Sequence, residues 1–404
     1  MNFVQELKWR GMIHDIMPGT EEQFQKEMTS AYIGFDPTAD SLHIGSLVQI
    51  MILVHLQKCG HKPYALIGGA TGMVGDPSGK SKERNLLNKE TLEHNLNCVK
   101  NQLEKFLDFD CGDNSAVVVN NFEWFEHLSF LDFIRDNGKH ISINYMMAKD
   151  SVKSRLETGL SFTEFSYQLV QGFDFYWLWK NKQCKVQLGG SDQWGNIVNG
   201  VELIKRYSNK QSYGLTTPLI TLATGAKMGK SENGAIWLDE KFLSAYDYWQ
   251  FWRNTDDRDV IKFLKNFTDM EIEDIKKIEN ENINDLKILL ANQTTSMLHG
   301  KKTAENSEQA AKEAFSGNSL GSNLPSIKID SKDIHEKLDI IDLILLSKLE
   351  KSKSEIRRLI KGNAVKINDK IISDEKLVIT NQFFNENYLK LSIGKKRHLK
   401  IELN

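Results

Sequence analysis

The first half of the chain alternates short β-type runs with helical stretches, and this alternation restricts the possible folds more than any other feature. Leu47, Ile50 and Met51, for example, share one face of a helix between two such runs. Alternation of this kind predicts an α/β fold, in which a parallel sheet carries helices on both faces. Ligands of such sheets bind at the carboxyl ends of the strands. The strands are predicted at residues 31–35, 63–67, 116–120, 141–144, 185–188 and 215–221.

The second half of the chain has a different character. From about residue 240 the pattern is helical and polar, with helices predicted at 242–253, 257–267 and 285–315. Residues 316–325 are rich in Gly, Ser and Asn, which is typical of a linker. We therefore expect a parallel-sheet domain, a helical domain, a linker and a small tail domain. Their predicted bounds are 1–231, 232–315, 316–336 and 337–404.

Composition places the chain among ordinary globular proteins. Of its 404 residues 40% are apolar and 26% are charged, a balance that excludes collagen-like and largely disordered chains. No apolar run approaches the ~18 residues of a membrane span, so no membrane partner is expected. Residues 1–16 predict an amphipathic helix rather than an export signal. Four cysteines without a CxxC pair indicate free thiols in a cytoplasmic chain and no zinc site.

Charge is distributed unevenly along the chain. Residues 337–404 contain 15 basic and 9 acidic side chains, a net charge of +6, whereas the whole chain has a net charge of −2. A basic tail on an acidic body is typical of a nucleic-acid partner. A solvated lysine-rich surface would have the same composition, so charge alone leaves both interpretations open.

Two glycine-rich segments, residues 68–81 and 225–231, suggest phosphate binding. A P-loop needs four residues between its glycines, but Gly75 and Gly79 enclose only three. The second segment misses the spacing in the same way. A difference of one residue in this spacing matters, because successive backbone N–H groups form the phosphate cradle. A P-loop NTPase is therefore disfavoured.

Two short motifs carry groups suited to an anion. In His43-Ile44-Gly45-Ser46 the start of a predicted helix favours negative charge, with Ser41 as the expected helix cap. In Lys227-Met228-Gly229-Lys230-Ser231 two cations three residues apart suit a polyphosphate. Taken alone, the first motif is better explained by a partly buried histidine at a helix start. The second motif, taken alone, is better explained by a solvated loop.

Together and in order, these segments resemble the HIGH and KMSKS signatures of class I aminoacyl-tRNA synthetases. Further blocks resemble the bacterial-type tyrosyl-tRNA synthetases, and the resemblance covers essentially the whole chain. It implies a Rossmann-like catalytic domain that activates L-tyrosine with ATP and then loads tRNA(Tyr). It also implies a homodimer. The blocks lie at residues 32–40, 75–80, 161–174 and 189–196.

The resemblance implies a set of residues that bind tyrosine. Tyr32 and Asp174 are expected at the phenolic hydroxyl. Asp76, Tyr167 and Gln171 are expected at the ammonium group. Tyr167, Gln171 and Asp174 follow one another at i, i+4 and i+7, so one helix face presents all three. A core aromatic is the alternative for Tyr167. Other residues implied on the substrate side are Asp36, near the reacting groups, Asn121 and Gln193.

The resemblance also implies a set of groups for ATP. Adenylate formation needs no general base, because the attacking tyrosine carboxylate is already ionised, so catalysis consists of positioning and charge stabilisation. A mobile loop carrying Lys227 and Lys230 would act mainly on the transition state. Mg²⁺ is expected with ATP as the substrate, without a protein metal site or a tightly bound cofactor. The implied groups are Thr38 and His43 at the γ-phosphate, the cations Lys80, Arg84, Lys227 and Lys230, Gly45, Ser46 and Ser231 beside the nucleotide, and Asp192 at the ribose.

Two positions depart from the signatures. Ser46 stands where the first signature ends in a histidine, which the resemblance places at the ribose. Serine keeps a hydrogen-bonding group but is shorter and carries no charge, so its contact stays open. Gly229 replaces the more usual serine of the second signature and should add flexibility to the loop.

The tail resembles an S-four-type RNA-binding domain. Ser352 and Glu355 have the spacing of a capping box, so a helix is expected to start there and to end at Gly362. A hairpin is predicted about residues 368–369. Evenly spaced cations on one helix face suit an RNA backbone. The cations expected to bind RNA are Lys353, Arg357, Arg358 and Lys361.

Two alternative functions remain at this point. A tryptophanyl-tRNA synthetase shares the fold and similar signatures, although the pair Tyr32 and Asp174 and the tail argue against it. A catalytically inactive synthetase-like module that binds or splices RNA is the other alternative. Intact Asp76, Tyr167 and Lys230 argue against that module.

Overall fold

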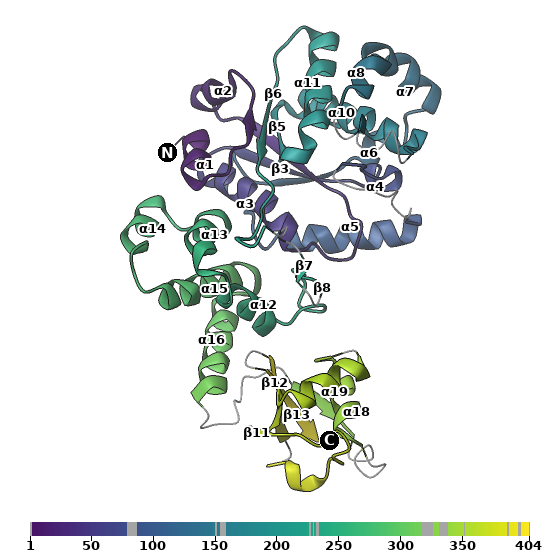
Figure 1. Ribbon diagram of the computed structural model, residues 1–404. Helices are drawn as coiled ribbons and strands as arrows, with labels where there is room; N and C mark the ends of the chain where they lie inside the picture. Colours follow the sequence, from purple (N-terminus) through teal and green to yellow (C-terminus); the bar gives the residue numbers. More distant parts are fainter. Residues whose placement is uncertain are drawn as a thin grey trace. The chain divides into compact units, whose positions relative to one another are not determined.

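The computed structural model forms two compact units, which are described separately (Figure 1). The first contains Met1–Phe242 and Asp256–Leu286, and the second contains Leu243–Thr255 and Lys287–Asn404. The residues that the structure describes are 2–78, 87–149, 152–153, 159–225, 228, 230–231, 234–316, 326–330, 338–350, 352–385, 388–394 and 397–403.

A six-stranded sheet organises the first unit, in the order β1-β6-β5-β2-β3-β4. Every strand pairing except that of β1 with β6 is parallel, which confirms the predicted α/β class. Nearly every residue of β3 and β5 is buried, as expected for strands covered on both faces. The strands are β1 (Asp15–Ile16), β2 (Ser30–Phe35), β3 (Lys62–Ile67), β4 (Val117–Asn120), β5 (Cys184–Gly190) and β6 (Tyr213–Thr217).

Helices cover both faces of this sheet. In Figure 1, α10 and α11 lie on one side of the strands, and α3 and α5 lie on the other. Tyr32, Phe175 and Ile204 belong to one core cluster between the sheet and the α10–α11 pair. The helices of the first unit are α1 (Phe3–Arg10), α2 (Thr20–Lys26), α3 (Ile44–Lys58), α4 (Thr71–Val74), α5 (Lys89–Leu103), α6 (Phe122–Phe125), α7 (Phe130–Asp136), α8 (Ile143–Met147), α10 (Phe162–Lys182), α11 (Trp194–Ser208), α13 (Val260–Phe267) and α14 (Ile272–Ile278).

Three elements predicted in the first unit differ from the structure. The strand predicted at 141–144 is wrong, because Ser142 caps a helix there by accepting the Tyr145 N–H. The strand predicted at 215–221 ends at Thr217, and the next residue, Pro218, has no N–H to offer a ladder. The helix predicted within 1–16 stops at Arg10, because Gly11 adopts a left-handed conformation with φ 71°.

The second unit contains helices and a small mixed sheet. The single helix predicted at 285–315 is two helices, separated at Gly300, whose φ is +87°. None of the helices that the structure describes has the length and apolar character needed to cross a membrane. The helices are α12 (Ala245–Arg253), α15 (Ile283–His299, which starts in the first unit), α16 (Lys301–Ser316), α18 (Ile340–Leu346) and α19 (Lys353–Lys361).

The tail sheet has five strands in the order β11-β10-β12-β13-β9. Its core consists of isoleucine, leucine and valine side chains from the strands and from α18 and α19. The hairpin about residues 368–369 is present, with β10 antiparallel to β11. One strand, β9, lies within the linker predicted at 316–336 and pairs with β13. The strands are β9 (Ser326–Ile329), β10 (Val365–Ile367), β11 (Lys370–Ile371), β12 (Tyr388–Ile393) and β13 (Arg397–Leu403).

Candidate active site

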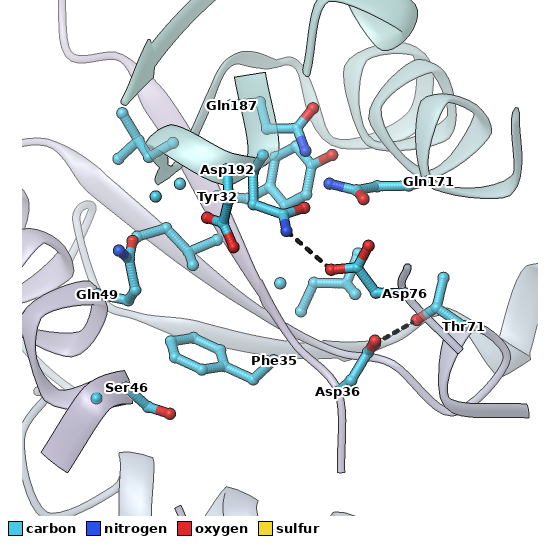
Figure 2. Close-up of a pocket in the computed structure, with 18 of the residues that line it drawn as sticks. Tyr32, Phe35, Asp36, Ser46, Gln49, Thr71, Asp76, Gln171, Gln187 and Asp192 are labelled. Atoms are coloured by element: carbon cyan, nitrogen blue, oxygen red, sulfur yellow. Dashed lines mark hydrogen bonds between the residues drawn. The ribbon is translucent and has the colours of Figure 1, made fainter. Parts of the chain in front are cut away.

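A cavity of about 290 Å³ opens at the carboxyl ends of β2 and β5, between α3 and α10 (Figure 2). This is the edge at which a parallel sheet binds its ligands. The cavity brings together twelve of the residues named from the sequence: Tyr32, Asp36, Thr38, His43, Gly45, Ser46, Asp76, Tyr167, Gln171, Asp174, Asp192 and Gln193.

One end of the cavity combines a buried hydroxyl with a buried carboxyl group. Asp174 on α10 accepts hydrogen bonds from Trp124 Nε1 at 2.8 Å and from Asn121 Nδ2 at 3.0 Å. Burial nevertheless raises the pKa of Asp174 to about 8. The hydroxyl of Tyr32 on β2 is buried and has no hydrogen-bond partner among the described residues. Burial also holds the pKa of Tyr32 far above its usual value, so its phenol stays neutral.

Asn121 lies behind this end and does not line the cavity. It is fully buried. Its Oδ1 accepts the Ala70 N–H at 2.7 Å, and its Nδ2 donates to Thr71 Oγ1 as well as to Asp174. Asn121 therefore fixes the position of the Asp174 carboxyl and of the first turn of α4.

Acidic and amide groups form the wall next to this end. Tyr167 Oη donates to Asp36 at 2.9 Å, and Gln193 Nε2 donates to Asp76 at 2.8 Å. Burial and the nearby charges of Asp36 and Asp76 hold the pKa of Tyr167 well above its usual range, so it remains a donor. Gln171 presents a buried Oε1 that no described residue satisfies. Two carboxylates and an open amide oxygen form a suitable environment for a cation.

The opposite end of the cavity is the start of α3. The structure corrects the expected cap: His43, not Ser41, is the N-cap, and its Nδ1 accepts the Gly45 N–H at 2.9 Å. Ser41 is buried, and its hydroxyl accepts from Gln102 and from the Asp239 N–H. A Cβ at Gly45 would lie 2.6 Å from the His43 ring, so a larger residue here would displace that ring.

The His43 side chain is exposed rather than partly buried. Its ring lies edge-on to Trp237 at a centroid separation of 6.3 Å. The backbone on both sides of it pairs with the chain at 236–238, because Ile44 N–H donates to Ile236 and Leu238 N–H donates to Leu42. His43 is thus held at the rim of the cavity by one segment distant in sequence, residues 236–238.

Two glutamines of the cavity were missed from the sequence. Gln49 follows Ser46 by three residues on α3; its Nε2 donates to Thr217 Oγ1, and its buried Oε1 has no partner among the described residues. Gln187 on β5 also presents a buried, unsatisfied Oε1. Figure 2 shows both side chains directed into the cavity. The i, i+3 spacing from Ser46 and the strand alternation with Gly189 are signals that would have identified them.

Some predicted residues fall outside what the structure describes. Lys80, Arg84 and Lys227 lie outside the described residues. Lys230 and Ser231 form the short strand β7 (Lys230–Ser231), whose backbone pairs with β8 (Gly234–Ala235). Among the described residues, no group of three His, Cys, Asp or Glu side chains could hold a metal ion.

The cations predicted to bind RNA lie on α19, which begins at the Ser352 cap as expected. Lys353 pairs with Asp342 at 2.8 Å, and Arg358 pairs with Glu355 at 2.7 Å. Arg357 and Lys361 are exposed and form no ion pair with any described residue. Two of the four cations are therefore available to an external anion.

Comparison with protein families agrees with this geometry. Residues 25–316 match the family described as tRNA synthetases class I (W and Y). Residues 317–401 match the tyrosine–tRNA ligase SYY-like C-terminal domain. The two matches together extend from β2 to β13.

Individual relatives agree over the full length. A tyrosine–tRNA ligase of Pelagibacter ubique is 56% identical over 406 residues, covering 99% of both chains. One from Cytophaga hutchinsonii is 48% identical and covers all of both chains. The crystal structure of a C-terminally truncated mitochondrial tyrosyl-tRNA synthetase of Aspergillus nidulans superposes with a TM-score of 0.69 at 32% identity, covering 78% of this chain and 94% of that one. The chain therefore belongs to the class I tRNA synthetases and, within them, to the tyrosine–tRNA ligases.

Proposed function

We propose that this tyrosine–tRNA ligase activates L-tyrosine with ATP in the cavity between α3 and α10 and then transfers the tyrosyl group to the 3′ end of tRNA(Tyr). The observation that carries the proposal is the buried pair of Tyr32 and Asp174. A tyrosine hydroxyl would satisfy both groups. Phenylalanine would leave the Tyr32 hydroxyl buried and unpaired, at a cost of about 1–3 kcal/mol, and would offer no donor to Asp174 beyond Trp124 and Asn121.

The wall next to this pair takes the amino-acid end of the substrate. Asp76 supplies negative charge to the tyrosine ammonium group, and Gln171 supplies an acceptor. Tyr167 keeps Asp36 in place, and Gln193 does the same for Asp76, because each donates to the carboxylate concerned. Asp36 then lies near the reacting carboxylate of tyrosine.

Adenylate formation is a displacement at phosphorus. A tyrosine carboxylate oxygen forms a bond to the α-phosphorus of ATP, the bond to the bridging oxygen breaks, and pyrophosphate leaves with that electron pair. No proton is removed, so the protein acts by alignment and charge stabilisation. The 3′-terminal ribose hydroxyl of tRNA then attacks the tyrosyl carbonyl and displaces AMP.

The nucleotide lies at the start of α3 in this proposal. Thr38 and His43 contact the γ-phosphate, and Asp192 contacts the ribose. Gly45 has no side chain, so the phosphates can approach the positive end of the α3 dipole at the helix start. Mg²⁺ enters bound to the phosphate oxygens of ATP, the ligands it prefers. The proposed ATP-binding residues also include Ser46 beside the nucleotide and the signature groups Lys80, Arg84, Lys227, Lys230 and Ser231.

The remaining parts have separate tasks. We assign catalysis to 1–231, the anticodon side of tRNA to the helical region 232–315, a connection to 316–336 and RNA binding to 337–404. Lys353, Arg357, Arg358 and Lys361 contact the RNA backbone. The same proposal places the protein in the cytoplasm, where ATP and tRNA are present.

A homodimer is part of the proposal. Large apolar side chains are exposed on three neighbouring elements: Leu131 on α7, Ile143 on α8 and Phe162 at the start of α10. The same elements share one core cluster beneath these side chains. Exposed apolar patches of this kind mark contact surfaces, and a second copy of the chain is the partner proposed here.

Tyrosine-dependent ATP–pyrophosphate exchange tests the proposal directly. Exchange is expected with tyrosine and not with phenylalanine or tryptophan, and Asp174→Ala should remove that discrimination. Sedimentation of the same preparation should give the mass of two chains. Exchange with tryptophan would overturn the assigned pocket. A folded protein that binds RNA but exchanges with none of the three would be the inactive module instead.

A further inference from the structure

The first turn of α13 binds a segment that borders the cavity. Asp259 accepts the Ala223 N–H at 2.7 Å, and Lys262 Nζ donates to the Thr221 carbonyl at 2.9 Å. The acceptor and the donor are three residues apart, so they lie on the same face of the helix. Together these two side chains hold the backbone between β6 and β7 at Thr221 and at Ala223.

The role of Asp259 is unusual for its position. It occupies the N-cap of α13 but makes no side-chain cap bond to its own helix. Its side chain is turned instead toward Ala223, and the residue is only 4% exposed. A buried carboxylate is costly unless it accepts hydrogen bonds. Asp259, which lies 36 residues after Ala223 in the sequence, therefore fixes the backbone of this segment.

The segment leads from α13 to the nucleotide end of the cavity. Leu219, two residues before Thr221, lines the cavity. Ile220 accepts the Met228 N–H at 2.9 Å, and Met228 is buried. The Met228 carbonyl lies 3.6 Å from the place where a Cβ of Gly45 would be. A displacement at Ala223 would thus reach both the lining of the cavity and the start of α3.

We propose that Asp259 is a positioning residue for tyrosine activation: with Lys262 it fixes residues 219–225 against the nucleotide end of the cavity. The inference rests on the proposed function. It assigns a role in the first reaction step to a residue that touches neither substrate. The tyrosine end of the cavity, around Tyr32 and Asp174, lies on other elements and should be unaffected.

The test compares two substitutions at one position. Asp259→Ala should lower kcat for pyrophosphate exchange about 10- to 100-fold, as expected for the loss of a buried charged acceptor. The KM for tyrosine should stay within about twofold, because the lost contact does not bind tyrosine. Asp259→Asn keeps a carbonyl oxygen that accepts the same N–H, and should restore most of the activity. Lys262→Met removes a donor from a half-buried side chain and should give a smaller loss of kcat.

Controls separate positioning from general damage. Asp257→Ala removes the same charge from the exposed side of that turn and should leave kcat unchanged. Transfer of tyrosine from preformed tyrosyl-adenylate to tRNA, measured in a single turnover, should be normal in Asp259→Ala, since pyrophosphate has already left. Equal losses in both steps, a raised KM for tyrosine, or no loss of exchange would overturn the inference. An inactive wild-type chain would instead refute the proposed function.

Discussion

At the scale of single residues, Asp174 is subject to opposing effects. Two N–H donors favour its carboxylate, but burial outweighs them and raises the pKa to about 8. The pKa of an aspartate in the unfolded chain is about 3.9. Between about pH 4 and pH 8 the folded chain therefore keeps a proton on Asp174 that the unfolded chain has released. The stabilisation from that proton is complete below about pH 4 and is lost as the pH rises toward 8.

The same carboxyl should make tyrosine binding depend on pH. A phenolic O–H donates best to a carboxylate, so binding favours the ionised form of Asp174 and releases a proton. The dissociation constant for tyrosine should therefore fall as the pH rises from 6 to 8, by at most about tenfold per pH unit, and then level off. Equilibrium dialysis with labelled tyrosine measures it.

Asp174→Asn is the matched variant, because the amide has the same shape and does not titrate in this range. It should bind tyrosine more weakly and with a flat profile between pH 6 and 8. A flat profile in the wild type, or an unchanged slope in the variant, would show that another group controls the dependence.

How much of the site can be predicted depends on what decides each position. Tyr167, Gln171 and Asp174 all line the cavity, because helical spacing alone places them on one face. Asn121 lies behind the cavity, and its distance from the substrate depends on tertiary packing. The choice of His43 over Ser41 as the helix cap has the same cause: the Ser41 hydroxyl is occupied by Gln102 and Asp239, which are far away in sequence.

At the scale of elements, α1 holds the end of α13. The side chain of Arg10 is 1% exposed and pairs with Glu6 at 2.7 Å. Its guanidinium also donates to the carbonyls of Lys265, Thr268 and Met270. Carbonyls at the end of a helix lack partners within the helix, so Arg10 satisfies groups that would otherwise be unpaired. It also anchors the helix that carries Asp259.

Arg10→Met should be strongly destabilising. It leaves Glu6 buried without its cation and three carbonyls without their donor, and breaking such a buried pair costs about 3–5 kcal/mol. Urea unfolding of the full chain measures the loss in free energy of unfolding, taken from the transition of the first unit. Lys8→Met is the control on the same helix, because the exposed pair of Lys8 with Glu21 contributes about 1 kcal/mol or less. Similar small losses in both variants would contradict the anchoring role.

Helices and strands could be predicted from the sequence where a single hydrophobic pattern dominated. The strands β2, β3 and β4 are mostly apolar, and most residues of β2, β3 and β5 are buried, as parallel strands covered on both faces should be. Residues 141–144 have a similar composition but lead into α8, which begins at Ile143, because the Ser142 cap and the packing of Met146 against α10 and α11 outweigh that composition. Short apolar runs do not distinguish a strand from a buried helix.

At the scale of the whole molecule, charge divides the chain by task. The tail has a net charge of +6, and its α19 presents Arg357 and Lys361 without an ion pair among the described residues. The cavity that would form the adenylate lies in the first unit and contains none of these cations. Removing tail charge should therefore affect the tRNA-dependent step alone.

Replacing Arg357 and Lys361 together by glutamine tests this separation. The KM for tRNA should rise about tenfold or more, and the salt dependence of tRNA binding should become shallower by about 1–2 in its log–log slope, because two phosphate contacts are lost. Tyrosine-dependent exchange without tRNA should be unchanged. Lys8→Gln with Lys100→Gln removes two exposed charges from α1 and α5, outside the regions assigned to tRNA, and serves as the control, since both lysines already pair with a carboxylate. If both double variants weaken tRNA binding equally, the effect is one of net charge, and α19 is not a specific RNA contact.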